Sequence, residues 1–243
     1  MRTDQQPPCG PGPMDDRLMN LARKTKGFMP DGEGLALYAA ALSVASHASK
    51  SWVEVGAYCG KSTVYLGAAA KSAGAVLFSV DHHNGSEENQ PGWEHHDPAL
   101  VDEGTGRMDT LPSWRRTINE AGLGMSVVGV IGESSVVSAH WAAPLAFVLI
   151  DGGHGEALAW ADLRGWAPLV ATGGVLAIHD VFEDPSEGGR PPYDIWKEAL
   201  ATGLFAEAGA CGSLRLLRRI DSGADWSRQV RQVREALAPE QSG

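Results

Sequence analysis

Cysteine, basic residues and long apolar runs are all scarce in this sequence of 243 residues. Its three cysteines, Cys9, Cys59 and Cys211, lie far apart and show neither a disulfide framework nor metal-binding spacing, which is typical of a reducing compartment. No segment approaches the roughly 18 consecutive apolar residues of a membrane span, and the N-terminus lacks the apolar run of a signal peptide. We therefore expect a cytoplasmic protein with no membrane partner.

Positive charge is outnumbered overall and is missing from one long segment. The chain has 20 Lys and Arg against 30 Asp and Glu, a formal net charge of −10. No basic residue lies between Lys71 and Arg107, whereas residues 72–106 contain seven acidic ones. Because nucleic acids and anionic membranes attract basic surfaces, this balance argues against either as the main partner. It favours a small neutral or cationic molecule.

Apolar residues, by contrast, make up 43% of the chain, which is enough for a sizeable core. Short apolar segments alternate with amphipathic ones, and this predicts an α/β fold with a mostly parallel sheet and helices on both faces. We expect strands near 52–55, 76–80, 125–131, 145–150, 174–178 and 214–218, and helices near 15–24, 34–49, 62–71, 112–121, 134–142, 156–170 and 195–203. A single domain at 15–220 would follow a disordered Pro-rich tail at 1–14 and precede a helix or tail at 221–243.

The residues that follow each strand are the most informative, because ligands of such sheets bind beyond the carboxyl ends of the strands. The first strand leads into EVGAYCGKST (54–63), whose glycines permit a sharp turn and whose Ser and Thr open a helix suited to an anionic group. This segment is neither a GxGxxG turn nor a Walker A loop. Asp81 follows the second strand, where an acid typically binds ribose hydroxyls. Together the two features predict a nucleoside-bearing ligand.

Acids and histidines follow the other strands. After the third strand, Glu133 and Ser134 either start a helix or contact a base. The fourth strand is followed by Asp151 and His154, and the fifth by His179 and Asp180. Two strand-end acids beside two histidines have the composition of a divalent-metal or acid–base site.

At this point residues 150–180, IDGGHGEALAWADLRGWAPLVATGGVLAIHD, resemble a pattern found in one group of class I S-adenosylmethionine methyltransferases. The pattern is D-G-x-H, an acid and a Trp in a helix, L-x-x-G-G and then H-D; with VEVGAYCGKS (53–62) and Asp81, the resemblance covers about residues 50–182. The group includes relatives of macrocin-type sugar O-methyltransferases and of cephalosporin-hydroxylase proteins, with a closer likeness to mycobacterial 1-O-methyltransferases of 3-O-methylmannosides. The resemblance implies a Rossmann-like class I methyltransferase fold. It also implies metal-dependent methyl transfer to a hydroxyl of a small neutral acceptor, most simply a sugar.

The resemblance further implies roles for individual residues. Binding of the S-adenosylmethionine donor would involve Glu54, Gly56, Ala57, Tyr58, Gly60, Ser62, Asp81, His82, Glu133, Ser134 and Asp151. Asp151, His179 and Asp180 would hold Mg²⁺, and His154 would be the general base. His179 departs from relatives that place two oxygen ligands after the fifth strand, and Mg²⁺ prefers oxygen. A site of two carboxylates completed by waters therefore stays open, and so does a metal-free enzyme.

The polar segment at about 82–110 is too long for a plain connection, and loops of this kind often bind substrates. A flat ring with polar groups suits a carbohydrate, and the candidate residues are Trp93, His95, His96, Asp97 and, further along the chain, Tyr193. A solvated acidic loop is the competing interpretation. The Gly/Pro-rich turn at 27–34 could likewise close the site or simply cap a helix.

Several other functions stay open on the sequence alone. A cephalosporin-hydroxylase-like protein would bind the donor and assist hydroxylation with a partner, and a natural-product or phenol O-methyltransferase would use the same site on another acceptor. A metal-dependent hydrolase leaves the glycine turn and Asp81 without a purpose, and a nicotinamide dehydrogenase would need the missing GxGxxG turn. A homodimer is neither required nor excluded.

Overall fold

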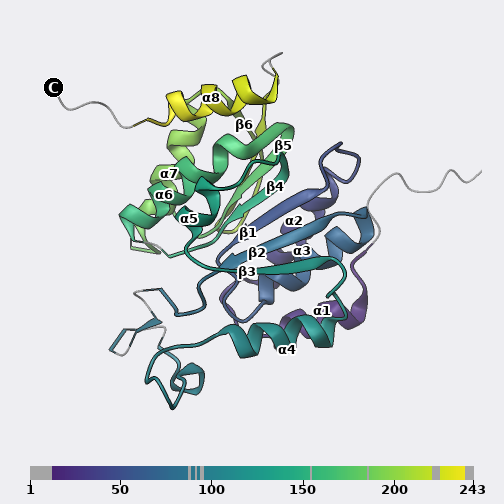
Figure 1. The fold of residues 1–243 in the computed structure, drawn as a ribbon, viewed down its shortest axis with the longest axis vertical. Coiled ribbons are helices and arrows are strands. Elements are labelled where there is room, and N and C mark those ends of the chain that lie inside the picture. Colours follow the sequence, from purple (N-terminus) through teal and green to yellow (C-terminus); the bar gives the residue numbers. More distant parts are fainter. Residues whose placement is uncertain are drawn as a thin grey trace, which may run out of the picture.

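The computed structural model describes residues 13–86, 89–90, 92–93, 96–153, 155–184, 186–220 and 225–238. In this part of the chain, seven strands form one sheet in the order β3-β2-β1-β4-β5-β7-β6 (Figure 1). The strands are β1 Ser51–Val55, β2 Val76–Asp81, β3 Val127–Ile131, β4 Leu145–Ile150, β5 Val170–Ile178, β6 Phe205–Cys211 and β7 Leu214–Arg219. Strands β1 to β5 pair in parallel, whereas β7 is antiparallel to both β5 and β6.

Helices cover both faces of the sheet (Figure 1). They are α1 Asp16–Lys24, α2 Asp31–Leu42, α3 Lys61–Ala73, α4 Leu111–Ala121, α5 Ser134–Ala139, α6 Glu156–Trp166, α7 Arg190–Ala201 and α8 Trp226–Ala236, with 3₁₀ turns η2 Pro98–Leu100 and η3 Ala167–Leu169. Helices α1 to α4 contribute to one apolar core, and α6 to α8 contribute to the other. Among the described residues, no helix combines the length and apolarity needed to cross a membrane.

The central strands explain why the two cores form. All six residues of β4, LAFVLI, are buried, as expected for a parallel strand with helices on both sides. Alternate side chains serve opposite faces: Trp52 and Phe147 pack in the α1–α4 core, whereas Val53 and Val148 pack in the other. The predicted fold class, a Rossmann-like methyltransferase sheet with helices on both faces, is thus confirmed.

Some predicted boundaries were wrong. Helix α2 begins at Asp31, inside the segment expected to be a turn, and α7 begins at Arg190, five residues before its expected start. The helix expected over 156–170 ends at Trp166, and β5 then starts at Val170 instead of residue 174. Strand β6 was missed because its sequence, FAEAGAC, is largely exposed at the sheet edge and carries no apolar run.

The sheet order positions the functional site. Strand β1 pairs with β2 on one side and with β4 on the other, so the chain reverses its direction of travel across the sheet between these neighbours. In open α/β sheets, ligands bind in the crevice that this reversal opens at the carboxyl ends of the strands. The site should therefore lie beyond Val55, Asp81 and Ile150.

Candidate active site

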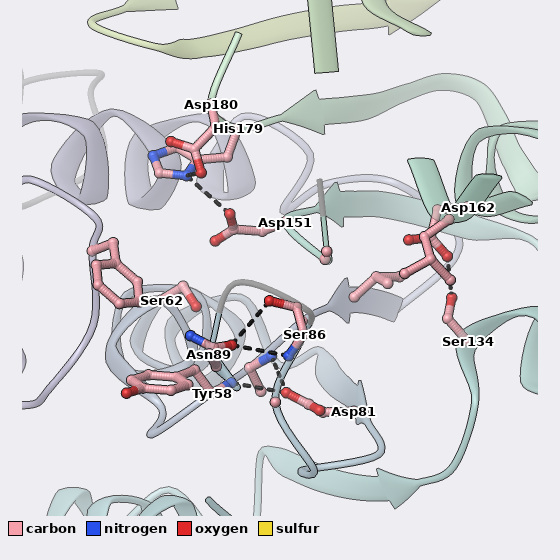
Figure 2. A pocket seen from close by; sticks show the side chains of 18 of the residues that line it. Tyr58, Ser62, Asp81, Ser86, Asn89, Ser134, Asp151, Asp162, His179 and Asp180 are labelled. Carbon is pink, nitrogen blue, oxygen red and sulfur yellow. Dashed lines mark hydrogen bonds and ion pairs between the residues drawn. The ribbon is translucent and has the colours of Figure 1, made fainter. Parts of the chain in front are cut away.

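A pocket of about 700 Å³ opens at the carboxyl ends of β1, β2, β4 and β5 (Figure 2). Its floor comes from the turns that follow these strands. Its walls come from Lys26–Met29, from the insertion after β2 and from the segment after β5, including Phe182 and Ser186–Gly189. Twelve predicted site residues line it: Gly56, Ala57, Tyr58, Ser62, Asp81, His82, Trp93, Glu133, Ser134, Asp151, His179 and Asp180.

The turn after β1 is shaped by a close backbone approach. Gly56 has φ of +84°, and a Cβ atom there would overlap the carbonyl oxygen of Asp151. Tyr58 also lies in the left-handed region with φ of 47°, an uncommon conformation for a residue with a side chain. Gly60 then precedes α3, whose first turn has no side-chain cap, and Ser62 of that turn faces the pocket. The N-terminus of α3, which has no side-chain cap, therefore lies beside the pocket, where helix N–H groups suit a negatively charged group.

Asp81 ties this turn to the end of β2. Its Oδ2 accepts hydrogen bonds from the backbone amides of Ala57, at 2.8 Å, and Tyr58, at 2.9 Å. Its Oδ1 accepts the amide of His83 at 2.7 Å. Because an ionised carboxylate offers about four acceptor positions, Asp81 keeps room for a hydroxyl donated from the pocket.

Glu54, predicted to bind the donor, lies beneath the turn and is not among the described residues that line the pocket. Its buried carboxyl accepts the hydroxyls of Ser62 at 2.5 Å, Thr63 at 2.7 Å and Ser79 at 2.7 Å. Burial raises the pKa of Glu54 to about 7, against the effect of these hydrogen bonds. Glu54 therefore supports Ser62 from below and reaches the pocket only through it.

At the β3 end, the pocket contains an acid that was not predicted, Asp162 of α6. Its Oδ1 accepts the Ser134 hydroxyl at 2.5 Å, and Ser134 in turn accepts the indole N–H of Trp166 at 2.7 Å. Burial raises the pKa of Asp162 to about 6. Its second oxygen lies beside the floor, where a Cβ on Gly152 would come within 2.9 Å of Oδ2. The acid and Trp of the helical pattern were the available signal for this residue.

At the β4 and β5 ends, Asp151, His179 and Asp180 converge (Figure 2), each offering one ligand atom within 4.8 Å of the others. The Nδ1 atom of His179 lies 2.9 Å from Asp151 Oδ1 and 3.3 Å from Asp180 Oδ2. Burial lowers the pKa of His179, but the charges and hydrogen bonds of Asp151, Asp180 and Glu33 outweigh it and raise the pKa well above the usual value.

Glu33 of α2 is a second functional candidate that was not predicted. It is buried, and its Oε2 lies 2.5 Å from Nε2 of His179. The backbone amide of Ser213 donates to Oε1 at 2.9 Å, and the Ser213 hydroxyl lies 3.1 Å from Oε2. Gly212 makes this approach possible, since a Cβ there would overlap Oε1. No sequence signal links residues 146 positions apart, so only the fold could reveal the pair.

Five predicted residues lie apart from the pocket lining, as far as the described residues show: Glu54, Gly60, His96, Asp97 and Tyr193. His96 faces the carbonyl oxygen of Asn89 at 2.9 Å, and Asp97 forms an ion pair with Lys26, which does line the pocket. Tyr193 packs edge-on against Trp196. The predicted base His154 and the predicted substrate residue His95 lie outside the described residues.

Aromatic rings form part of the pocket wall on the N-terminal side. Phe28 is 57% exposed and Trp93 is 53% exposed, although both line the pocket. Phe28 packs against Tyr58 with ring centroids 5.5 Å apart. The turn at 27–34, left between two interpretations by the sequence, thus contributes both a pocket wall at Gly27–Met29 and the start of α2.

The sheet order, with β7 inserted antiparallel between β5 and β6 and a pocket at the β1/β4 reversal, defines a Rossmann-like class I methyltransferase fold. A family model described as a methyltransferase domain matches residues 53–181, which is more than half of the chain. The chain belongs to this methyltransferase domain family.

Solved structures share the fold at low sequence identity. The O-methyltransferase NovP has a TM-score of 0.61 at 15% identity, over 79% of this chain and 81% of that chain. TomG from Streptomyces achromogenes, involved in tomaymycin synthesis, has a TM-score of 0.57 at 14% identity, over 85% and 91%. An O-methyltransferase from Bacillus cereus has a TM-score of 0.56 at 16% identity, over 85% and 92%.

Proposed function

We propose that this protein is an S-adenosylmethionine-dependent O-methyltransferase that acts on a hydroxyl of a small neutral acceptor, most simply a sugar. The observation that carries the proposal is that one pocket contains two groups of residues suited to different tasks. The glycine turn and Asp81 suit a nucleoside, and the Asp151, His179 and Asp180 cluster suits activation of a hydroxyl. TomG and the Bacillus cereus enzyme were solved in complex with SAM and SAH, respectively, which supports the choice of donor.

The donor would lie across the carboxyl ends of β1, β2 and β3. Its ribose would donate to Asp81, whose position at the end of the second strand suits that role. The adenine would then rest over Glu133 and Ser134, beyond the neighbouring strand β3. There the second oxygen of Asp162 would accept the adenine amino group, because a carboxylate oxygen offers only lone pairs to such a donor.

The donor set of Asp151, His179 and Asp180 fits a divalent cation, because two carboxylates and one imidazole nitrogen converge at the pocket floor. The sequence predicts Mg²⁺ here, held mainly by the two carboxylates. Such a cation would lower the pKa of the acceptor hydroxyl and orient it. Asp180 has a left-handed φ of 55°, a conformation that tends to persist where the surrounding structure over-determines it, often at functional sites.

Methyl transfer from the sulfonium is an in-line displacement, in which the acceptor oxygen bonds to the methyl carbon as the carbon–sulfur bond breaks. The acceptor proton must leave, and we assign His154 as the base because the resemblance described above implies a base three residues after the acid that follows β4. The pocket walls would hold the two reactants in line and exclude water. The backbone carbonyl of Asp151 packs against the donor turn at Gly56, and its carboxylate would face the reacting hydroxyl.

The acceptor would bind between the cluster and the aromatic wall. Phe28 and Trp93 offer flat faces for a ring, and the net negative insertion suits a neutral acceptor better than an anionic one. Within this class a methylated mannoside is the first acceptor to test, followed by other sugars and phenols. We propose neither a nucleic acid nor a membrane as partner.

The test is a methyl-transfer screen of the full chain with labelled donor, over sugars and catechols, with and without EDTA. We expect transfer to a sugar hydroxyl and its loss in EDTA. Replacing His154 by Ala should reduce turnover about 10²–10⁴-fold while SAH binding stays unchanged. SAH binding without transfer to any acceptor would instead favour a donor-binding protein that assists another enzyme. Near-normal turnover of the His154→Ala variant would refute its role as base.

A further inference from the structure

The buried contact between Glu33 and His179 determines how the histidine can act. Glu33 Oε1 accepts the backbone amide of Ser213, which can only donate, and Oε2 lies 2.5 Å from His179 Nε2. Because a carboxylate oxygen needs a donor at that distance, Nε2 carries a hydrogen. The other ring nitrogen, Nδ1, lies 2.9 Å from Asp151 and 3.3 Å from Asp180, and a cation bound there would replace the hydrogen that Nδ1 shares with these carboxylates and take up its lone pair.

This arrangement has the form of a carboxylate–histidine–metal relay, in which an outer carboxylate fixes the tautomer and the ring orientation of the ligand. Both members are held tightly, since His179 is 3% exposed and Glu33 is 6% exposed. Glu33 comes from α2 and its support comes from Ser213 before β7, so the imidazole is fixed from the side opposite the pocket.

We propose that Glu33 positions His179 as a nitrogen ligand, and that the resulting set of one imidazole and two carboxylates selects Mn²⁺ or Zn²⁺ over Mg²⁺. The proposal rests on the proposed function only in placing a cation at this cluster, and it changes the identity of that cation. Mg²⁺ favours all-oxygen octahedral surroundings with several waters, whereas imidazole suits the borderline transition metals. A rigid nitrogen at the third position therefore disfavours the ion that the sequence predicted.

The first experiment measures binding of Mn²⁺, Zn²⁺ and Mg²⁺ to the full metal-free chain by titration calorimetry. We expect Mn²⁺ to bind at least about 10-fold more tightly than Mg²⁺. Pulsed electron paramagnetic resonance on the Mn²⁺ form should show ¹⁴N coupling from one imidazole. In the His179→Asn variant, which keeps an amide oxygen but removes the ring, this coupling and the preference over Mg²⁺ should both disappear.

The second experiment isolates Glu33. The Glu33→Gln variant keeps the shape of the side chain but loses the charge, and it should bind Mn²⁺ about 10–100-fold more weakly with SAH affinity unchanged. If that variant does not fold, Ser213→Ala removes one of the contacts that hold Glu33 and should give a smaller loss in the same direction. Asp102→Asn, which removes an exposed acid of the insertion, serves as the charge-matched control.

Three results would overturn the inference without contradicting S-adenosylmethionine-dependent methyl transfer itself. They are Mn²⁺ bound without ¹⁴N coupling, Mg²⁺ bound as tightly as Mn²⁺, and a folded chain that binds SAH but none of the three ions. Failure of SAH binding would instead contradict the proposed function, because the hydrogen bonds between Asp81 and the donor turn involve neither Glu33 nor His179.

Discussion

The two ends of the pocket are built in different ways. At the donor end, Asp81 bonds to amides of a turn about 24 residues earlier, and both segments belong to consecutive strand–helix units. At the cluster end, Glu33 meets His179 across 146 positions, and Lys26 meets Asp97 across 71. The donor end is thus fixed by local chain geometry, whereas the cluster end depends on how distant segments pack. An acceptor site of the second kind can change with its loops while the donor site stays constant.

A buried glutamate supports each end, and the two differ in electrostatics. Burial raises the pKa of Glu54 to about 7 because its partners are three neutral hydroxyls. Burial also opposes ionisation of Glu33, but hydrogen bonds from His179 and Ser213 lower its pKa. Glu54 therefore supports the donor turn with a pKa close to neutral pH, whereas Glu33 supports the cluster as an anion.

The sharpest test of this difference is Glu54→Gln. The folded-state pKa of Glu54, about 7, exceeds the ordinary 4.5, so folding favours its protonated form. The stability it contributes is therefore complete below pH 4.5, declines as the pH rises towards 7, and is constant above that. Across this pH window, the free energy of unfolding of the wild type should fall by on the order of 3 kcal/mol relative to that of Glu54→Gln. Urea unfolding at pH 4.5, 5.5, 6.5 and 7.5 measures it.

A pH-independent gap between the wild type and Glu54→Gln would contradict the raised pKa. Glu120→Gln, at an exposed acid of α4, provides the surface control for the loss of one carboxylate. Both variants should retain the fold, since glutamine keeps the volume of the side chain at either position.

The second prediction weakens the donor end directly. In Asp81→Asn, the amide oxygen can accept fewer of the three backbone amides, and the ribose loses a charged acceptor. SAH affinity should fall on the order of 100-fold, while Mn²⁺ affinity at the cluster stays within about twofold. Calorimetry of both ligands on one preparation measures the separation. Equal losses of SAH and metal affinity would show that the two ends are one coupled unit.

How far the sequence could predict the site follows the same division. Gly56, Asp81 and Ser134 were predictable because each lies at or within three residues of the end of a strand, and parallel strands bring their carboxyl ends to one edge. Glu33 was not, because α2 starts inside a Gly/Pro-rich segment that is typical of a turn. Its role depends on a partner beyond β5 that local patterns cannot indicate.

The insertion at 82–110 shows which properties of a loop the sequence can and cannot predict. Its length and polarity predicted a substrate loop, and its described part includes Trp93 in the pocket wall. His96 and Asp97 bond instead to the loop backbone and to Lys26. Sequence composition could identify the segment, but side-chain direction in an irregular loop depends on tertiary contacts and follows no periodic pattern.

The third prediction concerns recognition of the donor's adenine by Asp162. In Asp162→Asn, the amide oxygen can still accept Ser134, which turns the amide nitrogen towards the pocket. A nitrogen donor there opposes the adenine amino group but suits the carbonyl oxygen of an inosine. The wild type should prefer SAH over S-inosylhomocysteine by about 10-fold, and the variant should lose or reverse that preference. An unchanged ratio of the two affinities would place the purine ring of the donor away from Asp162. Glu156→Gln, an exposed acid at the start of α6, is the control.

The smallest expected effect tests whether the two walls of the cluster end act together. Lys26 and Asp97 join the linker before α2 to the insertion, and their side chains are 51% and 29% exposed. Because solvent screens such pairs, a double-mutant cycle with Lys26→Met and Asp97→Asn should give a coupling of only about 0.2–1 kcal/mol in stability. If the pair also holds the acceptor walls together, each single variant should raise KM for the acceptor to the same extent as the double variant, and SAH affinity should not change. Additive KM effects would mean that the linker before α2 and the insertion are positioned independently of each other. Of the two long-range contacts compared above, only the one between Glu33 and His179 would then shape this end of the pocket.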